Sequence, residues 1–244
     1  MNILTGSRQR LSLPLLRWCP SPIVFVEPQE IKYYLEAHPG IFFHELSKND
    51  GGFSYLMNQM INYTLDRGER YFLFTDDDVT DLRIRKGLTE KFSRVPDSLW
   101  TDRLKDFAEA NDLAQLAVSF AGQSWAAKKE IQYGVGAWGV HLTDAKAVRA
   151  VGGYDESLPC FGDWDISARL LQAGYLTART NLVTFVHKMK SHEGGACDVY
   201  KKKRLVEEAA HRVAAKFPGC ATVKWVESHG LHEVRFNWKK LSSK

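Results

Sequence analysis

The segment from Gly52 to Gly68 places mostly apolar side chains on one face of a helix. They recur at i, i+3, i+4, i+7 and i+8 spacing, at Phe53, Leu56, Met57, Met60, Ile61, Thr64 and Leu65. Such a stripe has to pack against another layer, so we expect Met57 and Met60 in the core. The apolar run Tyr71–Phe74 follows and has the length of a buried strand. A helix that covers a buried strand indicates a layered α/β domain.

Strands and helices alternate along most of the chain, which favours a mostly parallel sheet flanked by helices. The expected strands are 2–4, 23–26, 71–74, 114–120 and 182–186, and the expected helices are 28–37, 52–68, 99–110 and 163–173. Asp144 is expected to cap a short helix that ends at Gly152 and Gly153, and residues 134–142 form either a strand or an active-site loop. A charged helix over 199–217 and a hairpin of 221–227 with 233–238 complete the chain. With 244 residues and 44% hydrophobic content, we expect one large domain over residues 1–196 and an extension over 197–244.

The formal net charge of +4 is distributed unevenly. Residues 187–244 hold 13 Lys and Arg against 6 Asp and Glu, so this segment carries +7 and the rest of the chain −3. A basic tail suits a polyanion such as nucleic acid, although a solvated lysine-rich helix has the same composition. The sequence has no apolar run long enough to span a membrane and no signal-peptide pattern. We therefore expect no membrane partner and a cytoplasmic location. The four cysteines show no C-x-x-C spacing, so we expect reduced thiols and no zinc site.

Three aspartates, Asp76, Asp77 and Asp78, follow the apolar strand directly. The carboxyl ends of strands are where open α/β sheets bind ligands. Carboxylate oxygens suit Mg²⁺ or Mn²⁺, which also bind substrate phosphates, so Asp76 and Asp78 in a D-x-D arrangement indicate a metal that bridges to a diphosphate. The alternative is an acidic loop that caps the next helix.

Two later blocks complete a pattern with this cluster: Gly152-Gly153-Tyr154-Asp155-Glu156 and Gly162-Asp163-Trp164-Asp165. The order of the motifs resembles that of GT-A fold nucleotide-sugar glycosyltransferases of the family 2 type, over residues 3–190. The resemblance implies that Asp76 lies near the donor ribose, that Asp78 binds the metal and that Asp163 is the catalytic base. Asp165 is the less favoured base. The resemblance also implies a nucleotide-sugar donor, such as a UDP-sugar, and inversion at the anomeric carbon.

The sequence departs from the family pattern at two places. Gly162-Asp163-Trp164-Asp165 stands where Glu-Asp-x-Asp is common, and Met57-Asn58 stands where an Arg-Asn pair is common. Asn58 is carried over as a donor-binding candidate. The family often has a histidine as a further metal ligand after the base-bearing helix, and His187 is preferred here by position, with His192 as the alternative. Single histidines are more often ordinary surface or core residues.

Further donor-binding candidates lie in loops. Thr5, Ser7, Arg8 and Arg10 follow the first strand, where arginine and backbone N–H groups suit phosphate, although a simple turn explains Gly6 and Ser7 equally well. Asp77 and Trp138 complete the set. Trp138 and Trp164 could stack on a sugar or a base, but tryptophan in a core is the commoner case.

The pattern of Ser7-Arg8-x-Arg10, the strand near Val24 and the three aspartates resembles the phage TET-associated glycosyltransferases. This resemblance implies that the acceptor is a hydroxymethylated pyrimidine in DNA, in the host cytoplasm if the protein is viral. Phosphate contacts need Lys and Arg, and an aromatic residue could stack on an exposed base. The nucleic-acid candidates are Lys201, Lys202, Lys203, Arg204, Arg235, Trp238, Lys239 and Lys240.

Three other functions fit parts of the sequence. A glycosyltransferase of this kind could instead act on a saccharide or protein acceptor. Asp76-Asp77-Asp78-Val79-Thr80 also fits the D-x-D-x-T pattern of haloacid-dehalogenase-like phosphatases, with Asp76 as the nucleophile and Asp163 in a later Mg²⁺ segment. That motif normally follows the first strand of its domain, whereas other strands precede it here. The third alternative is a non-enzymatic protein that binds nucleic acid through its basic tail. Such a protein would need no acidic cluster.

Overall fold

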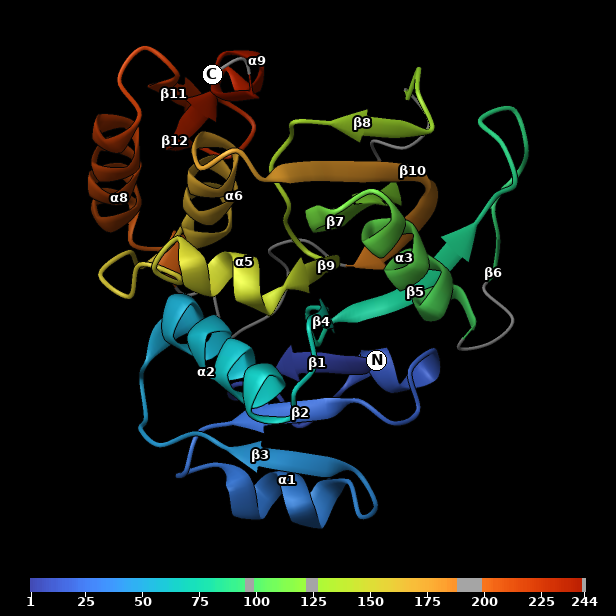
Figure 1. Ribbon diagram of the computed structural model, residues 1–244. Coiled ribbons are helices and arrows are strands. Elements are labelled where there is room, and N and C mark those ends of the chain that lie inside the picture. The colour runs from blue at the N-terminus through green and yellow to red at the C-terminus, as the bar shows by residue number, and fades with distance from the viewer. Residues whose placement is uncertain (95–98, 122–126, 188–198, 243–244) are drawn as a thin grey trace.

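The computed structural model describes residues 1–94, 99–121, 127–187 and 199–242 (Figure 1). Within these residues a ten-stranded sheet has the order β3-β2-β1-β4-β9-β7-β10-β5-β6, and β8 pairs with β10. The strands are β1 Asn2–Gly6, β2 Ile23–Val26, β3 Phe42–Glu45, β4 Tyr71–Phe74, β5 Val79–Ile84, β6 Ser93–Arg94, β7 Leu113–Phe120, β8 Ile131–Tyr133, β9 His141–Asp144 and β10 Leu176–His187. Through the pairings, β5, β8 and β9 run opposite to the other strands, so the sheet is mostly parallel, as expected.

Helices cover both faces of this sheet. The helices are α1 Ile31–Ala37, α2 Gly52–Asp66, α3 Leu99–Ala110, α5 Ala145–Ala150, α6 Gly162–Gln172, α8 Lys203–Lys216 and α9 Trp238–Ser242. Side chains of α2, α5 and α6 share one apolar cluster with β1 and β4, whereas α3 contributes to a cluster on the other face. Met57 and Met60 are fully buried in the first cluster, which confirms their expected place in the core.

The parallel pairing of β1 with β4 determines where the acidic cluster lies. Leu4 pairs with Phe74, and the Thr75 N–H donates to the Leu4 carbonyl at 3.1 Å. Both strands therefore end at the same edge of the sheet. This brings the loop after Gly6 next to the three aspartates that follow Thr75.

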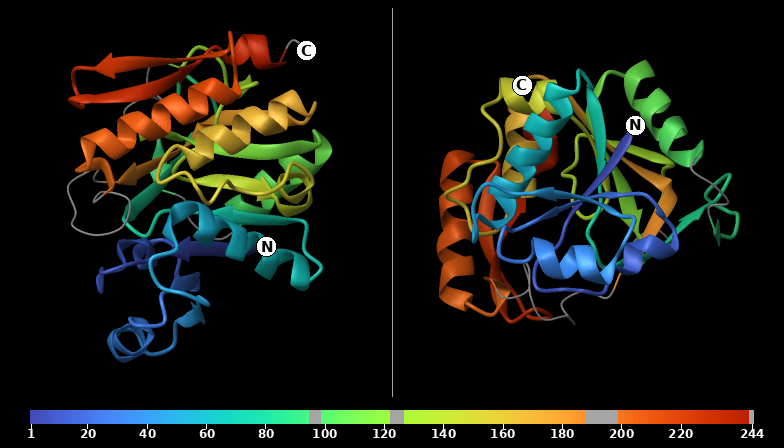
Figure 2. Two further views of the ribbon diagram at one scale, coloured as in Figure 1. Left: turned by 90° about the vertical axis from the view of Figure 1, so that its left-hand side faces the viewer. Right: turned by 90° about the horizontal axis from the view of Figure 1, so that it is seen from below.

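The last elements of the chain, here called the C-terminal extension, pack beside α6 (Figure 2). Its hairpin consists of β11 Ala221–Val226 and β12 Leu231–Phe236. Buried side chains of α8, β12 and α9 form one apolar cluster with Ala168 and Leu171 of α6. Helix α6 thus has the sheet on one side and the extension on the other.

Several element boundaries differ from the sequence prediction. The first helix begins at Ile31 instead of Pro28, and the strand expected over 182–186 is the second half of the longer β10. Trp238 was expected on the last strand, and this was wrong, because the chain leaves the hairpin at Asn237 and turns into α9. The Asn237 carbonyl accepts the Lys240 N–H at 3.0 Å, which closes the first turn of that helix. The alternating apolar pattern continues through Trp238 and so conceals this turn.

Candidate active site

Asp77 joins the acidic cluster to the loop after β1. Its two carboxylate oxygens accept hydrogen bonds from the Ser7 hydroxyl and from the Arg10 guanidinium, each at 2.6 Å. Tyr34 on α1 contacts the Ser7 hydroxyl at 2.8 Å. Asp77 is buried, and both of its oxygens are engaged. It therefore fixes the position of its neighbours Asp76 and Asp78.

Asp76 and Asp78 concentrate negative charge at the edge of the sheet. Burial, followed by the charges of Asp78, Asp77 and Asp163, raises the pKa of Asp76 well above its usual value. Arg10 lies 3.6 Å from Asp78 and offsets part of this charge. A carboxylate in these surroundings is stabilised in its ionised form by an additional cation.

Asp163 lies in the first turn of α6, near enough to Asp76 to influence its ionisation. Burial raises the pKa of Asp163 to about 7. Its side chain accepts the Trp164 N–H at 2.9 Å. A carboxyl with a pKa near neutral pH suits proton transfer, because ionised and protonated forms are both accessible.

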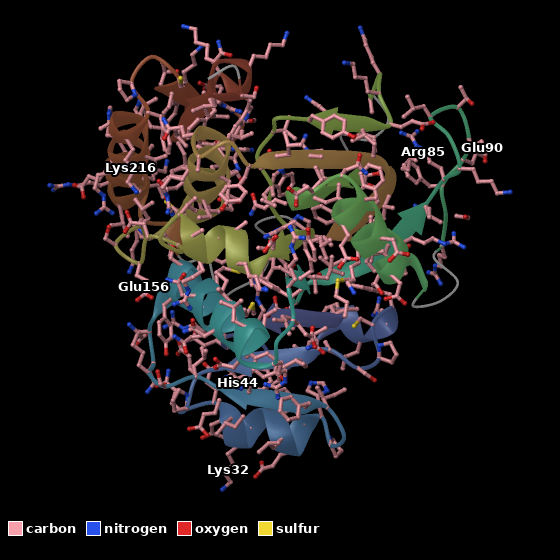
Figure 3. All side chains as sticks on the ribbon, in the orientation of Figure 1. Lys32, His44, Arg85, Glu90, Glu156 and Lys216 are labelled. Atoms are coloured by element: carbon pink, nitrogen blue, oxygen red, sulfur yellow. The ribbon has the colours of Figure 1, made fainter. Side chains whose placement is uncertain are left out.

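Asp165 has a different environment, although it is only two residues away. Its side chain is fully buried, and its oxygens accept from Arg169 Nε and from Lys216 Nζ, both at 2.8 Å. Lys216 projects from α8, where Figure 3 labels it. Asp165 thus ties the extension to α6, which favours Asp163 over Asp165 as the candidate base.

Gly162 explains one departure from the family pattern. A Cβ atom at this position would lie 2.7 Å from Ser54 Oγ of α2, so a glutamate here would collide with α2. The preceding residue, Phe161, has a φ of +63°, so the chain turns sharply into α6. The close packing of α2 against the start of α6 therefore requires glycine.

His187 lies at the end of β10, directly after a shift in register against β5. Its Nδ1 atom is 3.8 Å from Asp78 Oδ1. Three aromatic rings surround the imidazole: Phe185 stacks on it at 5.4 Å between centroids, and Phe120 and Trp138 lie at 5.5 and 6.4 Å. The alternative, His192, lies outside the described residues.

The site residues fit a divalent metal of the Mg²⁺ or Mn²⁺ type. Asp76 and Asp78 supply hard oxygen atoms, and His187 lies beside Asp78. Among the described residues, no group of three or more His, Cys, Asp or Glu is arranged to hold a metal ion by itself. Mg²⁺ commonly uses one or two carboxylates and takes its other ligands from water and substrate phosphates. A metal here would depend on the phosphates of a bound ligand.

Two of the remaining donor-binding candidates, Arg8 and Asn58, are already engaged. Arg8 pairs with Asp50 and lies 3.5 Å from Glu27, so it holds the first loop to the segment before α2. Asn58 exchanges hydrogen bonds with the Tyr154 backbone at 2.8 and 3.0 Å, which fastens the Gly-Gly-Tyr-Asp-Glu turn to α2. Thr5 is fully buried in β1, and its hydroxyl has no hydrogen-bond partner among the described residues. The contacts of Arg8 and Asn58 hold the fold together.

The nucleic-acid candidates fall into two groups. The exposed group consists of Lys201, Lys202, Lys203, Arg204, Arg235, Lys239 and Lys240. Arg204 pairs with Glu208 at 2.8 Å and borders an open hollow of about 840 Å³ beside α8, away from the acidic cluster. Trp238 differs, because its half-buried ring stacks on Phe236 at 4.6 Å. The exposed residues can contact phosphate, whereas the indole is occupied within the protein.

Sequence reasoning missed Ser167. Its hydroxyl oxygen lies 2.7 Å from Gln115 Oε1 and 2.7 Å from the Asp163 carbonyl oxygen, and it accepts the Ala137 N–H at 3.1 Å. It therefore connects helix α6, which carries Asp163, with the sheet and the loop before β9. No motif identifies a single serine of this kind.

The strand order and the helices on both faces of the sheet define an α/β protein whose fold matches that of solved glycosyltransferases. Residues 1–349 of S. aureus TarS have a similar structure, with a TM-score of 0.50 and 10% identity over 86% of this chain and 64% of that chain. TarS 1–349 in complex with UDP-GlcNAc gives a TM-score of 0.49 and 11% identity over 86% and 65% of the two chains. A197 from STIV gives 0.43 and 14% identity over 78% and 86%.

These similarities concern the fold. This chain covers 64% of the TarS structure. No protein-family model matches the sequence, and no curated protein matches it. Across the described residues, no helix is both long and apolar enough to cross a membrane.

Proposed function

We propose that this chain is a metal-dependent, inverting glycosyltransferase that moves a sugar from a UDP-sugar to a hydroxymethylated pyrimidine in DNA. The observation that carries the proposal is the meeting of Asp76, Asp78 and Asp163 at the carboxyl edge of a GT-A type sheet. A phosphatase that uses Asp76 as its nucleophile is disfavoured by this fold and by the position of β4, which is the fourth strand of the chain.

On the donor side, Asp78 and Asp76 hold the metal, with His187 as a further ligand. When bound, a divalent metal stabilises the negative charge that develops on the leaving diphosphate. Asp77 keeps both aspartates in place through Ser7 and Arg10. The motif resemblance also assigns Asp76 to the donor ribose.

On the acceptor side, Asp163 accepts the proton of the acceptor hydroxyl. The hydroxyl oxygen then forms a bond to the anomeric carbon, while the bond from that carbon to the diphosphate oxygen breaks. A single displacement of this kind inverts the anomeric configuration. The pKa of about 7 supports the role, because Asp163 is then ionised in an appreciable fraction of molecules at neutral pH.

The basic extension supports the choice of DNA as the acceptor. Lys201, Lys202, Lys203 and Arg204 are all exposed at the start of α8, where they can contact phosphate. A base within a duplex is out of reach of a donor held at the sheet edge, so a flipped or single-stranded base is required. A role for Trp238 in stacking on that base is no longer part of the proposal.

Transfer is tested by incubating the protein with Mn²⁺ and a panel of nucleotide sugars. The acceptors are hydroxymethylcytosine DNA, hydroxymethyluracil DNA, unmodified DNA and a small saccharide, and mass spectrometry of the digested nucleosides detects an added hexose. We expect a gain of mass on a hydroxymethylated nucleoside that disappears with EDTA. Transfer to the saccharide alone would contradict the DNA acceptor, and intact nucleotide sugars with no hexose added to any acceptor would contradict the transferase.

A further inference from the structure

Residues 134–140, here called the bridging loop, connect β8 to β9 and are held at several points. The Gly134 N–H donates to the Thr177 carbonyl at 2.8 Å, and the Thr177 hydroxyl donates to the Val135 carbonyl at 2.7 Å. The Arg179 guanidinium reaches the Gly136 carbonyl at 3.2 Å. These contacts join the first half of the loop to β10.

The second half of the bridging loop contacts both parts of the candidate active site. The Ala137 N–H donates to Ser167, whose hydroxyl oxygen lies 2.7 Å from the Asp163 carbonyl oxygen. The Trp138 ring lies 6.4 Å from the ring of His187. The loop therefore spans from the helix that carries Asp163 to the histidine beside Asp78.

Trp238 of α9 lies against the bridging loop. A Cβ atom on Gly136 would lie 2.6 and 2.8 Å from two carbons of the Trp238 ring, so only glycine allows this approach. The indole is held in turn by Phe236, stacked at 4.6 Å, and by Trp164, edge-on at 6.4 Å. Trp164 directly follows Asp163.

We propose that Trp238 is a positioning residue: its indole braces the bridging loop against α6 and thereby fixes the acceptor side of the active site. This inference rests on the proposed function for its catalytic consequence. It gives the C-terminal extension a second role, since the extension shapes the active site in addition to presenting exposed basic side chains.

The composition of the bridging loop explains why it needs a brace. It contains Gly134, Gly136 and Gly139, and glycine loses more conformational freedom on ordering than any other residue. Removal of the indole leaves the Gly136 backbone without its packing partner. A displacement of about 1 Å at a catalytic centre can cost on the order of a hundredfold in rate. Asp76 and Asp78 lie on the loop after β4 and are held there through Asp77, so the affinity for UDP with Mn²⁺ should change less than kcat.

The test compares Trp238→Ala with Trp225→Ala. Trp225 is a matched control, because it is a tryptophan of the same extension that is 51% exposed and whose ring pairs with Glu227 and His232 of the hairpin. For Trp238→Ala we expect faster amide hydrogen exchange in residues 134–140, a fall in kcat of about tenfold to a hundredfold, and a smaller change in the affinity for UDP with Mn²⁺. Trp238→Phe should recover part of kcat. Unchanged exchange in the loop, or equal effects of Trp225→Ala, would overturn the inference.

Gly136→Ala provides an independent variant that keeps the indole. Because the φ of Gly136 is not in the left-handed region, alanine strains the contact with Trp238 and not the backbone. We expect this substitution to speed loop exchange in the wild-type background and to have little effect in the Trp238→Ala background, since contacting residues are coupled. If the two substitutions had additive effects on loop exchange, this would contradict the proposal that the Trp238 indole holds the loop in place. The exchange measurements decide the inference even if the wild-type protein transfers no sugar, so its failure is distinct from failure of the proposed function.

Discussion

Asp165→Asn should lower stability strongly and leave the chemistry of transfer intact. Asp165 is fully buried and accepts one hydrogen bond from each of two cations, Arg169 and Lys216, at 2.8 Å. Asparagine has nearly the same shape but carries no charge, and its NH₂ group would face one of the cations. The substitution therefore leaves two positive groups without their shared partner.

The size of the loss follows from the burial of the three groups. Removing one partner of a buried ion pair costs about 3 to 5 kcal/mol. The lower end applies here, because the side chains of Arg169 and Lys216 are 22% and 34% exposed and can recover water. Lys216 also keeps Asp155 at 2.6 Å. A loss of about 3 kcal/mol corresponds to a fall in Tm of roughly 6 to 12 °C for a chain of this size.

Asp163→Asn is the matched control for this experiment. Burial raises the pKa of Asp163 to about 7. Above that pH the carboxylate is ionised in the folded protein, and its burial lowers the stability of the fold. At pH 8 in metal-free buffer, the neutral amide should therefore leave Tm unchanged or raise it. Scanning calorimetry gives both Tm values, and transfer is assayed well below them. If Asp165→Asn keeps its Tm and abolishes transfer, Asp165 is the base and the reasoning is refuted.

Three further outcomes are expected. Asp78→Ala should abolish the Mn²⁺-dependent part of UDP affinity in calorimetry, because Asp78 supplies the oxygen next to His187; full metal-dependent affinity in this variant would rule Asp78 out. The transfer rate should fall as pH drops below about 7, since Asp163 must be ionised to accept a proton, and a pH profile flat from 5 to 9 would argue against it. Replacing residues 201–204 with alanine should make the plot of log DNA affinity against log salt concentration less steep. If each side chain contacts one phosphate, the magnitude of the slope should fall by up to about 3.6. An unchanged slope would place the DNA elsewhere.

The parts of the fold that follow from local sequence pattern were predicted. The amphipathic stripe determined α2 and its buried methionines, and the apolar run before the aspartates determined β4. Strands of mixed polarity, such as β3 and β5, were not predicted, because they form by pairing with their neighbours. A single sequence contains no record of that pairing.

The candidate site shows the same division. The strand end placed Asp76 and Asp78 at a ligand-binding edge, and the motif order pointed to Asp163. The partners of these residues are distant in the chain: Arg10 is 67 residues from Asp77, and Lys216 is 51 residues from Asp165. The spacing of the motifs alone could not show that Asp165 pairs with Arg169 and Lys216, or that Asn58 binds the backbone of Tyr154. The catalytic and binding roles themselves stay predictions.

The most direct test of the account measures transfer by Asp163→Asn at saturating donor and acceptor, together with its affinity for UDP and Mn²⁺. The account predicts a kcat lower by about a hundredfold to ten-thousandfold with an unchanged affinity, because the amide keeps the shape of the carboxylate and cannot accept the proton. A kcat near that of the wild-type protein would contradict the assignment of Asp163 as the base.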